Sequence, residues 1–180
     1  MDNILKLKNS CRLLYSLFSI LLLIIPIYYA GYWLLINEIP SSLVNVNIES
    51  TSLIRNVLSL KLKIIGFIAS LPVLFSLFTV VKSLQNLFSL YKEGEIFSFK
   101  HVKLFKKCAT YLLLWVIFSI LHESSKSVIF SISNPPGERI LTLGISSSEI
   151  TTILVGVTVF VLAWVMDEGR VLNEEIKLTV

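Results

Sequence analysis

Long uncharged, apolar runs separated by polar stretches constrain this chain more than any other feature of its sequence. Two of them, Leu13–Ile36 and Ile64–Val81, contain no charged residue, and a helix needs about 20 such residues to cross a bilayer. Only 16% of the residues are charged, against roughly a quarter in soluble domains. The sequence therefore predicts a mainly α, multi-pass membrane protein. The expected spans are residues 13–36, 64–81, 104–123 and 150–166.

The third span is the shortest of the four. Its strictly uncharged part, Cys108–Leu121, has 14 residues, a length that on its own favours a buried or re-entrant segment. Two neighbouring lysines, Lys106 and Lys107, are able to snorkel to the headgroups. Leu104 and Phe105 extend the apolar face towards the basic side. These additions favour a full span over residues 104–123.

The Lys-rich loop at residues 82–107 sets the predicted orientation. Short loops that carry many Lys and Arg residues remain in the cytoplasm. With four spans, eleven Lys and Arg residues fall on the side of this loop and of both termini, and five fall on the other side. We therefore expect both termini inside, in a cell membrane, with outer loops at residues 37–63 and 124–149. An aromatic belt at the outer interface is expected at Tyr28, Tyr29, Tyr32 and Trp33.

The outer loops show alternating patterns that predict strands. Val44–Ile48 alternates apolar and polar residues, and so does most of Ser127–Ser133. A turn at Asn134–Gly137 and a second β-rich run at Arg139–Ile145 complete a predicted hairpin. A lone hairpin is marginal in water. We therefore expect the two outer loops to form one small, three-stranded extracytoplasmic β-sheet.

Helix start and stop signals divide the rest of the chain. The second helix is expected to continue past Lys82 as an amphipathic segment, with Lys82, Gln85, Asn86 and Ser89 on its polar face, and to stop at Gly94. Ser98 is the expected cap of the third helix. The spacing of Ser146 and Glu149 is that of a capping box, which predicts the start of the fourth helix.

The basic side is the candidate site of interaction. Its lysines recur at helical spacing and are expected to contact anionic lipid or a protein partner: Lys100, Lys103, Lys106 and Lys107. The alternative is that they serve only to orient the chain. Asp167 and Glu168 leave the membrane on the same side, so they are expected to meet Lys106 or Lys107 if the third and fourth helices are neighbours.

Other chemistry has weak support in the sequence. His101 and His122 fall on opposite sides of the membrane, so they cannot share a metal ion. His122 and Glu123 are either an outer acid–base pair or an interfacial hydrogen bond at a helix end. Cys108 is either a reactive thiol or a packing residue. We expect no enzyme activity, no cofactor and no direct contact with nucleic acid.

The preferred function is therefore interaction or sensing, with a small oligomeric transporter or channel subunit as the alternative. Ionisable groups inside spans usually mark transport paths, and the four predicted spans contain none apart from Lys106, Lys107, His122 and Glu123 at the two ends of the third. A homo-oligomer is compatible with either function.

Short motifs near the middle and the end of the chain carry a family resemblance. They are Gly94, Phe97 and Ser98, then Gly169, Leu178, Thr179 and Val180. With them the chain resembles a family of bacterial four-helix membrane proteins, domain of unknown function 2975. The resemblance implies four spans, both termini inside, and often a neighbouring gene for a small helix-turn-helix regulator, which is a candidate partner. Lys177 departs from the acid that commonly precedes the terminal Leu-Thr-Val.

Overall fold

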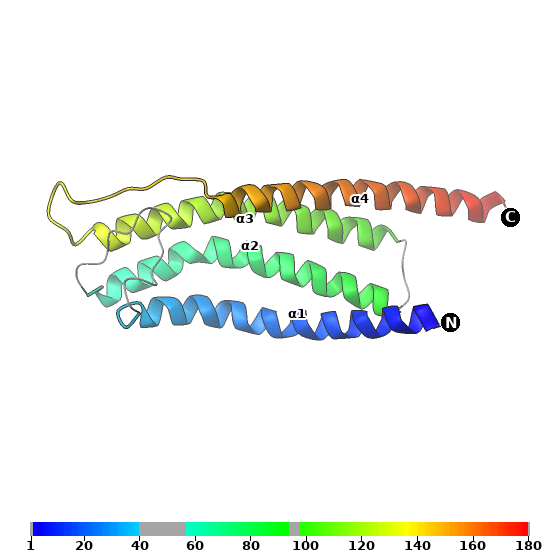
Figure 1. Cartoon of the computed structure of the whole chain (residues 1–180), viewed down its shortest axis with the longest axis horizontal. Coiled ribbons are helices and arrows are strands. Elements are labelled where there is room, and N and C mark those ends of the chain that lie inside the picture. The colour runs from blue at the N-terminus through cyan, green and yellow to red at the C-terminus, as the bar shows by residue number, and fades with distance from the viewer. Residues whose placement is uncertain (1, 40–56, 94–97, 180) are drawn as a thin grey trace.

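Four long helices make up the structure, a computed structural model that describes residues 2–39, 57–93 and 98–179. The helices are α1 (Asp2–Leu35), α2 (Leu60–Glu93), α3 (Phe99–Ser131) and α4 (Ser147–Thr179). Each packs against the next one in the chain, so that they form a row from α1 to α4 (Figure 1). Both termini, the end of α2 and the start of α3 lie at one end of the row, here called the termini end, and the opposite end is the loop end (Figure 1).

All four helices are long and apolar enough to cross a membrane. Each has 33 or 34 residues and is therefore about 50 Å long, against about 30 Å for a hydrocarbon core. The helices thus extend well beyond the predicted spans. α3 is one continuous helix, and it includes the whole third apolar run. The third apolar run therefore does not form a short re-entrant segment.

The predicted outer hairpin is wrong. No strand occurs in residues 2–39, 57–93 and 98–179, and Ser127–Ser131 is the last part of α3. The physical reason is that the serines bond to their own helix: Ser127 Oγ donates to the carbonyl oxygen of Ser124, and Ser131 Oγ to that of Ser127. The serines that produced the alternating pattern thus lie mostly on one buried face of a helix. The other predicted strand, Val44–Ile48, lies outside the described residues.

The β-rich run Arg139–Ile145 lies along the end of α3 without forming a strand. The amide of Ile140 donates to Ser131 Oγ at 3.0 Å, and the amide of Thr142 donates to Ser127 Oγ at 3.1 Å. The same two serine hydroxyls therefore serve the helix and hold the returning chain. Side-chain acceptors replace the partner strand that the sequence pattern predicted.

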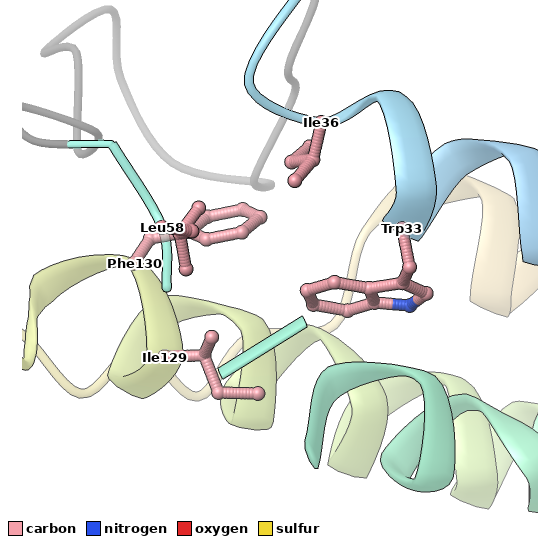
Figure 2. Close-up of a cluster of buried hydrophobic side chains, with 5 residues drawn as sticks. All are labelled: Trp33, Ile36, Leu58, Ile129 and Phe130. Atoms are coloured by element: carbon pink, nitrogen blue, oxygen red, sulfur yellow. The ribbon is translucent and has the colours of Figure 1, made fainter. Parts of the chain in front are cut away.

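An apolar cluster closes the loop end between α1, α3 and the segment before α2 (Figure 2). Its members are Trp33, Ile36, Leu58, Ile129 and Phe130. Trp33 is only 2% exposed, so its assignment to an interfacial belt is wrong. Its indole packs against Gly66 in α2, where a Cβ atom would overlap the ring. The absence of a side chain at Gly66 thus allows the tryptophan to enter the core.

The start of α4 forms one half of the predicted capping box. The Ser146 amide donates to Glu149 Oε2 at 2.9 Å, and the Ser146 hydroxyl bonds to the same oxygen. The second oxygen, Glu149 Oε1, accepts a hydrogen bond from Ser119 Oγ in α3 at 3.2 Å. Glu149 is buried, and it therefore joins the beginning of α4 to the middle of α3 as well as capping the helix.

Candidate functional site: a basic cleft between α2 and α3

A cleft of about 430 Å³ lies between α2 and α3 towards the termini end. Three of its seven lining residues are lysines from the first turns of α3, and the remainder are polar or apolar residues of both helices. The lining residues are Asn86, Ser89, Leu90, Lys100, Lys103, Leu104 and Lys107. The structure thus brings together three of the four lysines that the sequence singled out.

The fourth lysine, Lys106, faces α4 instead of the cleft. Positions 100, 103 and 107 follow the spacing of one helix face, whereas position 106 is turned by about 100° from position 107. Lys106 Nζ reaches Asp167 Oδ2 in α4 at 3.3 Å. The other oxygen of Asp167 accepts hydrogen bonds from Arg170. The four lysines are therefore divided: three line a cleft beside α2, and one forms an ion pair with α4.

Ser98 stands at the start of α3, as the sequence predicted, but its side chain does not cap the backbone. Its backbone is extended, with φ −134° and ψ 155°, and its hydroxyl lies 2.8 Å from His101 Nδ1. The ring of His101 packs on that of Tyr91 in α2, with centroids 4.6 Å apart. These contacts fix the first turn of α3 against the end of α2, and this turn carries Lys100 and Lys103.

The remaining motif residues fall into two groups. Gly94, Phe97 and Val180 lie outside the described residues. Gly169, Leu178 and Thr179 belong to α4, and none of the described side chains of that helix lines the cleft.

The chemistry of the cleft is that of an anion site. Three ammonium groups face a space whose lining contains no carboxylate, and Asn86 and Ser89 offer amide and hydroxyl donors. Leu90 and Leu104 supply an apolar wall beside them. The lining offers charge, hydrogen bonds and apolar contact to a phosphate-bearing ligand, and it includes neither a cysteine nor a histidine to act as a nucleophile or a base.

Metal binding has no comparable site in the described part of the chain, where no three His, Cys, Asp or Glu side chains come together. His101 belongs to the first turn of α3, while His122 lies six turns further along the same helix, towards the loop end. Cys108 is buried in α3, which agrees with a packing role for its side chain.

The sequence predicted only part of the α2 side of the cleft. The amphipathic extension of α2 is present, and Asn86 and Ser89 belong to its expected polar face. Gln85, expected on the same face, is instead buried and donates to Ser19 Oγ in α1 at 2.7 Å. Helical spacing identified the polar residues, but it could not say which of them α1 would cover and which would face α3.

The four apolar helices define the class: this is a multi-pass membrane protein. Residues 14–180 match the family described as protein of unknown function (DUF2975), and the chain belongs to that family. The resemblance found in the short motifs is thereby confirmed over most of the chain. No curated protein and no solved structure matches the sequence.

Proposed function

We propose that this protein is a non-enzymatic interaction and sensing protein of the bacterial cell membrane, with its termini end in the cytoplasm. The cleft between α2 and α3 binds the phosphate group of an anionic lipid. The observation that carries this proposal is the convergence of Lys100, Lys103 and Lys107 on one cleft whose lining has no acidic residue.

The position and size of the cleft fit a lipid headgroup. Basic pockets between membrane helices on the cytoplasmic side are typical sites for anionic headgroups. Each lysine near the surface contributes about 1 kcal/mol of attraction to such lipids, so three contribute about 3 kcal/mol. Leu90 and Leu104 line the same cleft and provide contact for the first methylene groups of the acyl chains.

The test is lipid-dependent stability of the purified protein in nanodiscs. We expect thermal unfolding at a higher temperature in phosphatidylglycerol than in phosphatidylcholine. The double variant Lys100→Gln/Lys103→Gln should lose most of this difference. Lys61→Gln/Lys92→Gln removes the same charge from two exposed positions outside the cleft and should keep it. Equal losses in both double variants would refute specific binding in the cleft.

The protein partner implied by the family resemblance is a different occupant of the same surface. A helix-turn-helix regulator that crosslinks to the wild type and not to Lys100→Gln/Lys103→Gln, with no lipid dependence, would replace the lipid in this proposal. The transporter alternative has its own test. Ion or solute flux through liposomes containing the purified protein would favour it over sensing.

A further inference from the structure

A second cavity, of about 170 Å³, lies between α1, α2 and α3 on the loop-end side of the molecule. Aromatic rings of α1 and α3 make up much of its wall, and one valine of α2 and four ionisable or hydrogen-bonding residues of α3 complete it. The lining residues are Tyr28, Tyr29, Tyr32, Val73, Trp115, Ser119, His122, Glu123 and Lys126. It is distinct from the basic cleft, with which it shares no residue.

Buried polar atoms at this cavity have no hydrogen-bond partner in the protein. They are His122 Nε2, Glu123 Oε2 and Trp115 Nε1. His122 is only 8% exposed, and its ring is flanked by Tyr29 and Trp33, with centroids 6.3 and 6.5 Å away. A buried polar group without a partner costs about 1–3 kcal/mol. Three such groups around one cavity indicate that a polar guest forms the missing hydrogen bonds.

The cavity carries no net charge. Lys126 Nζ lies 2.5 Å from Glu123 Oε1 and 5.9 Å from the centre of the Tyr32 ring. The protein thus supplies its own cation to both the carboxylate and the aromatic ring. A cationic guest would meet Lys126, and an anionic guest would meet the remaining oxygen of Glu123. Electrostatics therefore favour an uncharged guest.

Ionisable residues such as His122, Glu123 and Lys126 are costly within a membrane helix and are usually functional. The apolar cluster of Figure 2 contains Ile129 and Phe130, about two turns beyond His122 along α3, and Tyr32 packs against it. The cavity therefore has an apolar cover towards the loop end. Tyr28 is 64% exposed and stands at the open edge of the cavity.

We propose that this cavity binds a small uncharged organic molecule that carries both a hydrogen-bond donor and an acceptor, of the amide or alcohol class. Its donor faces Glu123 Oε2, its acceptor faces the Trp115 indole N–H, and its apolar part lies against the tyrosine rings. At about 30 Å³ per water-sized group, the cavity of about 170 Å³ holds a guest of about six such groups. The site would give the protein a ligand from the outer side, independent of lipid at the basic cleft.

The test uses one molecular skeleton with three charges: acetamide, acetate and acetamidinium. The full chain in detergent is labelled with ¹⁵N at the tryptophan indoles, and the three signals are assigned with Trp→Phe variants. Acetamide should shift the Trp115 signal with a saturable dependence on concentration. Trp164, which is exposed on α4, should not shift. No saturable shift at Trp115, or equal shifts with all three compounds, would overturn the proposal.

Charge substitutions sharpen the test, because a merely structural effect would not change the preference for charge. Glu123→Gln removes the carboxylate that pairs with Lys126 and should raise acetate affinity by about tenfold or more. Lys126→Met leaves Glu123 and should do the same for acetamidinium. Both variants must retain the Trp33 and Trp164 signals of the folded wild type. An unchanged preference in the folded variants would place the guest elsewhere and refute the site.

Discussion

Lys106 Nζ lies 3.3 Å from Asp167 Oδ2, and this ion pair joins α3 to α4 at the termini end. The expectation that the acids of the fourth helix meet the lysines of the third is thereby confirmed for this pair. Asp167 lies within α4, more than three turns before its end at Thr179, and its carboxylate is bonded by both Lys106 and Arg170. The contact therefore orients the second half of α4 against the first turns of α3.

Charge reversal should reveal this contact. Asp167→Lys places a third cation beside Lys106 and Arg170, so we expect a lower thermal unfolding temperature in detergent. Adding Lys106→Glu should restore part of the loss, and only part, because Arg170 is still opposed. Lys107→Glu in the same background is the matched control, since Lys107 lines the cleft instead. A double variant that shows only the sum of the two single effects would contradict coupling between the helices.

Gly66→Ala should destabilise the protein more than any other glycine substitution in α1 or α2. The new Cβ would overlap the Trp33 ring, and overpacking a core typically costs about 1–3 kcal/mol. Gly31→Ala is the control, because nothing lies within 4 Å of a Cβ at that position. It should leave the free energy of unfolding unchanged or raise it by up to about 1 kcal/mol, as alanine favours helix. Reversible unfolding in detergent measures both, and equal effects would argue against close packing at Gly66.

Much of the helical framework could be predicted from the sequence, because a bilayer permits few structures for uncharged runs of this length. The failure at Ser127–Ser131 has a specific cause. Alternation of serine with apolar residues indicates a strand in water, but serine hydroxyls satisfy helix carbonyls and an incoming segment equally well. The two serines bond to α3 and to the chain at Ile140 and Thr142, and this arrangement depends on contacts distant in sequence.

The sequence predicted the lysines of the candidate site, but it did not predict which neighbouring helix each lysine faces. Spacing along α3 identified Lys100, Lys103, Lys106 and Lys107. In the structure Lys106 pairs with α4, and the other three line the cleft beside α2. Tyr28, Tyr29 and Tyr32 were assigned to an outer belt, yet all three also line the second cavity. Helix packing decides which face of a membrane helix contacts protein and which contacts lipid. The sequence does not show this, because both faces are similarly apolar.

Removal of the Glu149 carboxylate should loosen the start of α4. Glu149→Ala leaves the Ser146 amide and Ser119 hydroxyl without their acceptor, and loss of a helix cap costs about 0.5–2 kcal/mol. Glu149→Gln keeps one acceptor oxygen and should lose less. Thr151→Ala is the control, because its exposed hydroxyl bonds only to the carbonyl of Ser147 in the same helix. Hydrogen exchange at Ser146–Ile150 should accelerate in Glu149→Ala, and an equal change in Thr151→Ala would contradict a special role for Glu149.

The orientation of the helices is the prediction with the widest consequence, because it decides which compartment each cavity faces. The Lys-rich connection between α2 and α3 should remain in the cytoplasm. A reporter inserted at Gly94 or fused after Val180 should therefore read cytoplasmic, and one inserted at Pro136, which is exposed between α3 and α4, should read extracytoplasmic. Replacing Lys100, Lys103, Lys106 and Lys107 by Gln should make the Gly94 signal mixed, because the outer side already holds Arg55, Lys61 and Lys63. An extracytoplasmic signal at Gly94 in the wild type would reverse the topology, and the basic cleft would then face away from the anionic inner leaflet that it is proposed to bind.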